Sequence, residues 1–181
     1  MRIGADGLAA GARQVASPNC DERPAGAEVT LLVLHAISLP PGKYGGDAIE
    51  RLFTNRLDPG AHPYFASIAG LRVSAHFLVR RDGEVVQFVP VTRRAWHAGE
   101  SSWRGRARCN DFSVGVELEG ADADRFAPEQ YAALARLVPA LRERLPLREL
   151  AAHSDVAPGR KTDPGAGFDW AALLAALARP A

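Results

Sequence analysis

The chain has little cysteine and little lysine, and it has no long apolar run. Only two of its 181 residues are cysteines, Cys20 and Cys109, which is too few for the disulfide framework of a small secreted domain. No apolar run approaches the roughly 20 residues of a membrane-spanning helix, and the start of the sequence lacks the apolar core of a signal peptide. We therefore expect a cytoplasmic protein with no membrane partner.

Net charge is also nearly absent. The 22 basic residues almost balance the 21 acidic ones, so the formal charge is +1. This balance gives no general attraction to nucleic acid or to a membrane surface. The length and the 47% of hydrophobic residues suit one domain with a sizeable core. We expect a single monomeric domain over residues 1–181, in which residues 1–28 wrap the surface without forming a domain of their own and the first strand starts near Val29.

The hydrophobic pattern predicts a mixed α/β fold with a central mixed sheet packed by helices. The apolar run at residues 29–34 is typical of a central strand that is buried on both faces. Residues 75–80 and 85–89 predict a hairpin around Asp82 and Gly83. Further strands are predicted at 112–118 and 150–153, and helices at 47–53 and 170–177 and in a long segment from Pro128, which Pro139 should bend or break. Residues 54–72 and 92–111 are expected to be loops.

Two histidines and an aspartate near strand ends form a candidate metal site. His35 ends the first apolar run, His153 ends the last predicted strand, and Asp163 follows in a loop rich in proline and glycine. Two imidazoles and a carboxylate are the ligands of catalytic zinc sites that keep one position open. The three residues converge only if the two strands are neighbours. Because a histidine at a strand end is more often an ordinary core residue, these residues alone leave both interpretations open.

Glu117 and Lys161 are candidate catalytic groups. Glu117 interrupts an apolar strand, and near a metal it would serve as a general base. Glu119 must lie on the same side of that strand, so an exposed strand face, or a carboxylate pair for glycoside hydrolysis, is the alternative. The glycosidase hypothesis leaves the two histidines without a role. Lys161 would stabilise an oxyanion; an ordinary surface lysine is the alternative.

Four long motifs carry a resemblance to a known family. They are LVLHAISLPPG at residues 32–42, RAWHAG at 94–99, CNDFSVGVELEG at 109–120 and HSDVAPGRKTDPG at 153–165. Together they resemble the AmpD family, the cytosolic 1,6-anhydro-N-acetylmuramoyl-L-alanine amidases of bacterial cell-wall recycling. The resemblance covers roughly residues 8–172, and the motifs occur in the same order.

The resemblance implies a zinc amidase with the fold of peptidoglycan recognition proteins and phage amidases. Its substrate would be a small molecule, an anhydromuropeptide, cut between the lactyl group and L-alanine. By the resemblance, His35, His153 and Asp163 are the zinc ligands, Glu117 is the base and Lys161 stabilises the transition state.

The resemblance also assigns substrate contacts. Arg72 and Arg108 match positions that hold the acidic groups of the stem peptide, where guanidinium groups suit carboxylates, and Trp96 would line the sugar pocket. Solvated loop charges and plain packing are the respective alternatives. His76 and His97 match no zinc position and are expected to be structural.

The chain departs from the family at two positions, and two other functions are alternatives to the amidase. Ala36 stands where the family commonly has an asparagine that touches the substrate, and Ala152 replaces a glycine. A non-catalytic peptidoglycan-binding module would be expected to lack a metal ligand, and none is missing. An envelope amidase acting on intact wall is disfavoured by the absence of a signal peptide.

Overall fold

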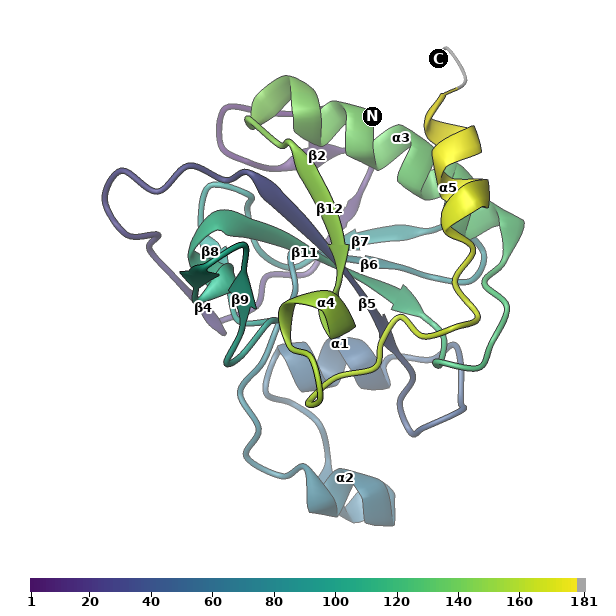
Figure 1. The fold of residues 1–181 in the computed structure, drawn as a ribbon. Coiled ribbons are helices and arrows are strands. Elements are labelled where there is room, and N and C mark those ends of the chain that lie inside the picture. Colours follow the sequence, from purple (N-terminus) through teal and green to yellow (C-terminus); the bar gives the residue numbers. More distant parts are fainter. Residues whose placement is uncertain (179–181) are drawn as a thin grey trace.

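The computed structural model describes residues 1–178, and its centre is a six-stranded sheet (Figure 1). In spatial order the strands are β12 (Glu149–Ala152), β5 (Leu31–Ile37), β11 (Ser113–Glu119), β6 (Phe77–Val79), β7 (Val85–Gln87) and β3 (Arg13–Gln14). Neighbouring strands are parallel except β6 and β7, which form the predicted antiparallel hairpin. The predicted mixed α/β class with a central mixed sheet is confirmed.

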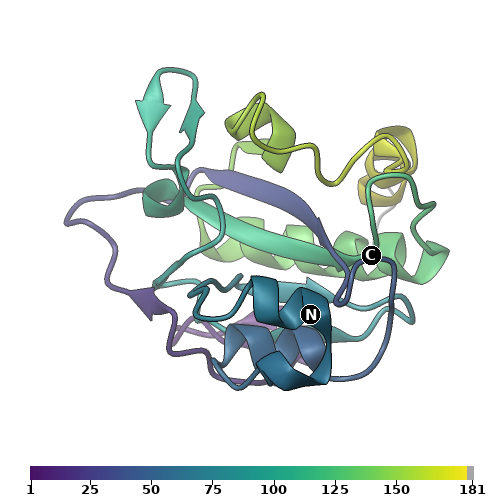
Figure 2. The same cartoon turned by 90° about the horizontal axis from the view of Figure 1, so that it is seen from below.

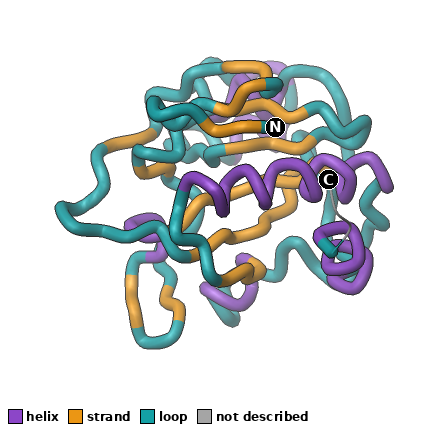
Figure 3. The backbone as a smooth tube through the Cα atoms, turned by 90° about the horizontal axis from the view of Figure 1, so that it is seen from above, coloured by secondary structure: helices purple, strands orange, loops and turns teal. Residues whose placement is uncertain are grey.

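Alternate residues of the central strands face different layers, as the two-residue period of a strand requires. One set packs in the core beneath α3 (Pro128–Arg144) and α5 (Trp170–Leu177), and its members are Leu32, Leu34, Val114, Val116 and Leu118. In the view from above, α3 runs across the near side of the sheet (Figure 3). His35 and Glu117 alternate with this set, so they point to the other face.

The other face is covered by smaller elements. Helices α1 (Ala48–Phe53) and α2 (Pro63–Ser67) lie on the near side in the view from below (Figure 2). They enclose a second core with β6 and β7 that includes Phe53, Phe65 and Leu78. A third cluster joins β5 to the 3-10 helix η2 (Cys109–Phe112) and to α4 (His153–Val156). The cleft described below opens on this face of the sheet.

The prediction that the first strand starts near Val29 is wrong. Strand β1 (Arg2–Ile3) pairs with β2 (Ala9–Ala10), β4 (Cys20–Asp21) pairs with β8 (Arg94–Ala95), and β3 adds an edge strand to the main sheet. Strands of two residues are too short to show a hydrophobic period. Long-range pairing forms β3 and β4, whereas β1 and β2 pair with each other. Near β3, for example, the backbone N–H of Val15 donates to the carbonyl of Gln87 over 2.9 Å.

The two segments expected to be loops also contain short elements. Residues 54–72 include η1 (Pro59–Ala61) and α2, and residues 92–111 include β8, β9 (Ser102–Trp103), β10 (Arg106–Ala107) and part of η2. His62, expected to be a loop residue, accepts the backbone N–H of Tyr64 at its Nδ1 and so caps α2. Single-turn helices fixed by such caps carry too few residues for a helical period to be visible.

Of the two effects predicted for Pro139, a bend or a break, the break does not occur, because α3 continues from Pro128 to Arg144. Pro139 lies on the exposed side of the helix, where the loss of one backbone hydrogen bond is tolerated. The opposite side buries Leu134, Leu137 and Leu141 against the sheet, and this packing outweighs the defect. Among the described residues, no helix is long and apolar enough to cross a membrane.

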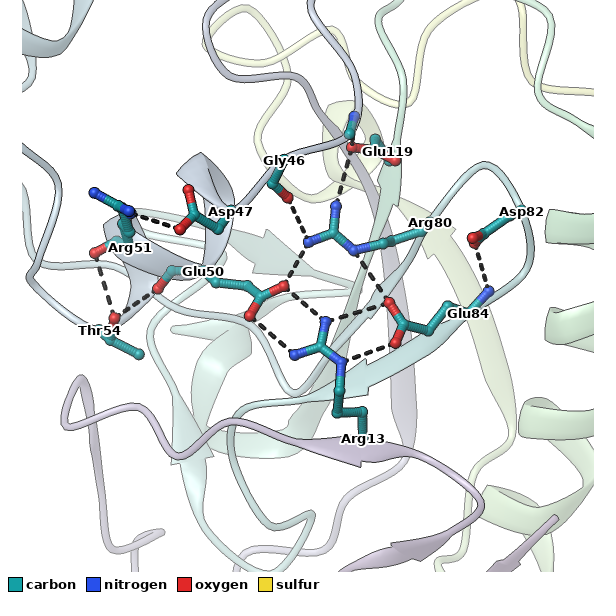
Figure 4. A network of polar contacts seen from close by, with 11 residues as sticks. Arg13, Gly46, Asp47, Glu50, Arg51, Thr54, Arg80, Asp82, Glu84 and Glu119 are labelled. Carbon is teal, nitrogen blue, oxygen red and sulfur yellow. Dashed lines mark hydrogen bonds and ion pairs between the residues drawn. The ribbon is translucent and has the colours of Figure 1, made fainter. Parts of the chain in front are cut away.

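A network of ion pairs ties α1 to the sheet (Figure 4). Arg13 of β3 contacts Glu50 at 2.7 Å and Glu84 at 2.8 Å. Arg80 also contacts Glu50 and Glu84, and its Nη1 lies 3.4 Å from Glu119 at the end of β11. The network thus joins one carboxylate on α1 to strands β3 and β11 and to the turn between β6 and β7.

Candidate metal centre

Strand register brings the predicted ligands together. Strand β5 lies between β12 and β11, so the condition that the two histidine-bearing strands are neighbours is met. Ala152 pairs with Leu34, which places the next residue, His153, beside His35. His153 begins α4 and does not end the strand as predicted, because Asp155 accepts the backbone N–H of Ala152 and turns the chain into a helix.

Three ligand atoms meet at one point. His35 Nδ1 lies 2.9 Å from His153 Nδ1, and Asp163 Oδ2 lies 3.0 Å from His153 Nδ1 and 3.4 Å from His35 Nδ1. Both histidines are buried, and Asp163 is half-buried. The loop that carries Asp163 returns to the site because the Ser154 N–H donates to the Asp163 carbonyl over 3.0 Å.

The donor set fits a tetrahedral divalent metal. Ligand bonds of roughly 2.0–2.2 Å in tetrahedral geometry separate neighbouring donor atoms by roughly 3.3–3.5 Å, close to the separations of 2.9, 3.0 and 3.4 Å seen here. A buried Glu117 oxygen, Oε2, has no hydrogen-bond partner among the described residues. A buried carboxylate oxygen without a partner is costly unless another group reaches it. Both observations fit a site built for a cation and a polar substrate.

The surroundings of the site keep His35 neutral and Asp163 charged. Burial lowers the pKa of His35 to about 4, so its imidazole is neutral and able to bind a metal near neutral pH. Burial alone would raise the pKa of Asp163, but its contacts with His153 and His35 outweigh burial and bring that pKa well below its usual range. Neutral imidazole with ionised carboxylate is the protonation state that metal binding needs.

Glu117 lies directly opposite His35 in the parallel pair of β5 and β11. It is 9% exposed, which excludes the exposed strand face as an explanation. Burial, with a smaller contribution from the charge of Asp163, raises its pKa well above 4.5. A raised pKa suits a carboxylate that accepts a proton and passes it on.

Glu119 has a structural role. Its Oε1 accepts the backbone N–H of Gly45 over 2.7 Å and faces Arg80, and its Oε2 accepts the N–H of Arg81. A carboxylate satisfied in this way is not available as an acid or a base. The pair of carboxylates needed for glycoside hydrolysis is therefore absent from this strand.

Two of the three candidate ligands, His153 and Asp163, line a cleft of about 350 Å³. Glu117 and Lys161 line this cleft together with His153 and Asp163, and Trp96 lines it with apolar residues of the α2 region. The structure therefore brings both candidate catalytic groups and one of the three candidate substrate contacts to the same cleft. The other lining residues include Ile37, Leu39, Tyr64, Ile68, Leu71 and Val73.

The two candidate substrate arginines lie outside this cleft. Arg72 is exposed and lines a separate small hollow beside Leu71. The Arg108 side chain is 70% exposed, and its Nε lies 3.2 Å from a carboxylate oxygen of Asp111. Their contact with substrate stays a prediction that would require the surrounding loops to close.

His97, which the sequence analysis treated as structural, lines the cleft and contacts a candidate ligand. Its Nδ1 lies 2.9 Å from His35 Nε2. The sequence signal that was missed is Gly115, a glycine inside a buried strand, where a Cβ would collide with the His97 ring. Glycine in a strand interior often marks the close approach of another group.

Comparison with known proteins identifies the family. Residues 25–166 match the model of the N-acetylmuramoyl-L-alanine amidase family. The chain is 56% identical over 172 residues to the 1,6-anhydro-N-acetylmuramyl-L-alanine amidase AmpD of Citrobacter freundii, which covers 94% of this chain and 92% of the relative.

Solved structures agree with this match. A crystal structure of a selenomethionine AmpD derivative superposes with a TM-score of 0.95 at 54% identity, covering 98% of this chain and 99% of the other. The Escherichia coli amidase AmiD, solved with the substrate anhydro-N-acetylmuramic acid-L-Ala-D-γ-Glu-L-Lys, superposes with a TM-score of 0.61 at 28% identity, covering 87% of this chain and 65% of that one. The match to the family model and the identity to AmpD over most of both chains show that this chain belongs to the N-acetylmuramoyl-L-alanine amidase family.

Proposed function

We propose that residues 1–181 form a single cytoplasmic, monomeric, zinc-dependent amidase domain. It hydrolyses the amide between the lactyl group and L-alanine of 1,6-anhydro-N-acetylmuramoyl peptides in cell-wall recycling. The observation that carries the proposal is the convergence of His35, His153 and Asp163, the last two of which line one cleft with Glu117. The identity to AmpD over most of both chains supports the reaction and the substrate class.

In this proposal His35, His153 and Asp163 hold the zinc ion. When bound, zinc supplies Lewis-acid chemistry, polarising a carbonyl and making water more acidic. Two imidazoles and one carboxylate leave a coordination position free for the reaction, whereas structural sites are usually closed by cysteines. Both cysteines lie outside the ligand cluster.

The chain's own residues then move the protons and hold the developing charge. Glu117 Oε2, buried and without a partner among the described residues, takes a proton from the attacking water and delivers it to the leaving nitrogen of L-alanine. The Lys161 ammonium group, in the same cleft, stabilises the oxyanion that forms on the lactyl carbonyl.

The remaining residues bind the substrate. Trp96 lies in the apolar part of the cleft, where its ring would cover a face of the sugar. Arg72 and Arg108 would pair with the acidic groups of the stem peptide when the loops that carry them close. The substrate bound in the AmiD complex carries a D-γ-glutamyl residue, which supports an acidic ligand.

Mass spectrometry of reaction products tests the proposal. Purified protein is incubated with zinc and either 1,6-anhydro-N-acetylmuramoyl tripeptide or the matching muropeptide with an open reducing end. The proposal predicts release of free peptide from the anhydro substrate, with slower release from the other. Binding of the anhydro substrate without cleavage would indicate a recognition module, and cleavage of intact wall alone would indicate an envelope amidase.

A further inference from the structure

We propose that His97 is a positioning residue that, with the carbonyl of Ala98, holds both imidazole ligands with their Nδ1 atoms turned toward the metal. The inference rests on the proposed zinc-dependent function and adds a role for a segment that holds none of the ligands. His97 does not contact the substrate in this account. It acts through His35.

The hydrogen-bond partners of His97 assign its tautomer. Ser113 Oγ donates to the carbonyl of Cys109 over 2.6 Å, so its proton is already used. The contact of 3.2 Å between Ser113 Oγ and His97 Nε2 therefore has the ring N–H as its donor. With its proton on Nε2, a neutral His97 presents a bare Nδ1.

This assignment extends to the metal ligand. His97 Nδ1 lies 2.9 Å from His35 Nε2 and accepts its proton. A neutral imidazole that donates from Nε2 has a lone pair on Nδ1. In His35 this Nδ1 is the atom that faces His153 and Asp163. The series of hydrogen bonds from Cys109 through Ser113 and His97 thus fixes which nitrogen of His35 has a free lone pair.

The carbonyl of Ala98, the residue after His97, orients the second candidate ligand, His153. His153 Nε2 lies 3.3 Å from the carbonyl oxygen of Ala98, which can only accept. With a metal ion between His153 Nδ1 and Asp163, His153 would carry its proton on Nε2, donate it to this carbonyl and present its Nδ1 lone pair to the ion. Two consecutive residues, His97 and Ala98, orient both imidazoles. Metal-bound histidines commonly donate their other N–H to such partners, which fix the ring orientation.

The segment is itself held rigidly. Asn110 Oδ1 accepts the backbone N–H of His97 over 3.2 Å and that of Ala98 over 2.8 Å. Gly115 leaves the space that the His97 ring occupies against β11, since a Cβ there would collide with the ring. His97 is 9% exposed. These contacts leave the ring little freedom to turn away from His35.

Zinc affinity of substituted proteins tests the inference. His97→Leu removes the acceptor at nearly the same volume and should weaken zinc binding about 10- to 100-fold, the usual cost of losing such a partner. His97→Asn places an amide oxygen near the Nδ1 position and should restore most of the affinity. Affinity is measured by competition with a chromophoric chelator, and thermal unfolding of the metal-free proteins shows whether each variant folds.

His76→Leu is the matched control. His76 is a buried histidine whose ring centroid lies 5.7 Å from that of His97, and its hydrogen bonds reach Gly115 and Arg93, outside the ligand set. This variant should lower the unfolding temperature and leave zinc affinity near that of the wild type. Ser113→Ala, which removes the acceptor of the His97 ring, should give an intermediate affinity and decides the matter if His97→Leu does not fold.

The possible results separate the inference from the proposed function. A wild-type protein that binds no zinc contradicts the proposed function itself. If the wild-type protein binds zinc, two results contradict the inference alone. One is that folded His97→Leu binds zinc equally well, and the other is that His97→Asn loses as much affinity as His97→Leu. Unchanged affinity in Ser113→Ala also contradicts it. Cobalt-substituted protein adds a spectroscopic readout, because misoriented ligands change the visible absorption of the ion.

Discussion

Glu117 is the residue whose environment departs most from that of an ordinary carboxylate. It lies opposite His35, is almost fully buried, and has one oxygen without a partner among the described residues. Burial raises its pKa well above 4.5, and the charge of Asp163 adds to this effect. The structure therefore holds a base that binds a proton more readily than a surface glutamate does.

Removal of this carboxylate should abolish most of the activity. We expect Glu117→Gln to lower kcat by about 10²- to 10⁴-fold, the usual contribution of a general base. Because the base works when deprotonated and its pKa is raised, wild-type kcat/KM should rise with pH through that raised pKa. The variant should lose this dependence.

The control for this prediction is Glu119→Gln, on the same strand face. Glu119 is hydrogen-bonded to the backbone of Gly45 and Arg81, so its loss should lower stability without a comparable loss of rate in the folded protein. Near wild-type rates in zinc-loaded Glu117→Gln would remove Glu117 from the mechanism.

The residues of the site were largely predictable, and their partners were not. His35, His153 and Asp163 stand out because histidine and aspartate at strand ends and in rigid loops are unusual, and Glu117 because it interrupts an apolar strand. His97 gives no such signal, since a histidine in a loop of mixed polarity has many ordinary roles. Its contact with His35 depends on a fold that joins residues 62 positions apart.

At the scale of elements, helix α1 is stabilised more by its ion pairs to the sheet than by its intrinsic helical stability, which a short helix lacks. It has six residues, too few for stability in isolation. The Glu50 carboxylate accepts from both Arg13 and Arg80, and its side chain is 14% exposed. Hydrogen bonding to Arg13 outweighs burial and lowers the pKa of Glu50.

Loss of this carboxylate should destabilise the fold in a pH-dependent way. We expect Glu50→Gln to lower the free energy of unfolding by about 2 kcal/mol at about pH 7, as for hydrogen bonds to charged groups. Because the folded-state pKa of Glu50 is lowered, its contribution is present above the usual value near 4.5 and is lost as pH falls through the folded-state value. The difference between variant and wild type should therefore shrink in acid. Urea unfolding at several pH values measures it.

Asp47→Asn is the matched control on the same helix. Asp47 pairs with Arg51 at 2.7 Å, but both side chains are at least half exposed. Exposed pairs contribute about 0–1 kcal/mol, so this variant should change stability much less. Equal losses in the two variants at neutral pH would show that burial of the Glu50 network is not what matters.

Element prediction succeeded where patterns are long and failed where they are short. The long helix from Pro128, the helix at Trp170–Leu177 and the hairpin have several periods of apolar residues, and each was found. Of the two-residue strands in the first 28 residues, β3 and β4 exist only through distant partners. In the same segment the half-buried Arg23 donates to backbone carbonyls of residues 91, 110, 111 and 113, contacts that no local pattern indicates.

At the scale of the whole molecule, the strand order β12-β5-β11 creates the site. His153 follows β12, His35 lies on β5 and Glu117 on β11, so three segments separated by more than 30 residues meet on one face. Mixed α/β class follows from the sequence pattern, but this order does not. The family resemblance supplied the expectation, and the register of the central strands shows how it is achieved.

Metal content and activity, measured together, are the most direct test of whether one zinc ion bound by His35, His153 and Asp163 is needed for cleavage. Purified protein is stripped with a chelator, then titrated with zinc while metal stoichiometry and cleavage of an anhydromuropeptide are measured together. We predict no cleavage by the stripped protein and full recovery of activity at one zinc ion per chain. His153→Ala should neither bind zinc nor recover activity. Full activity of the stripped protein, or normal zinc binding by His153→Ala, would contradict these predictions.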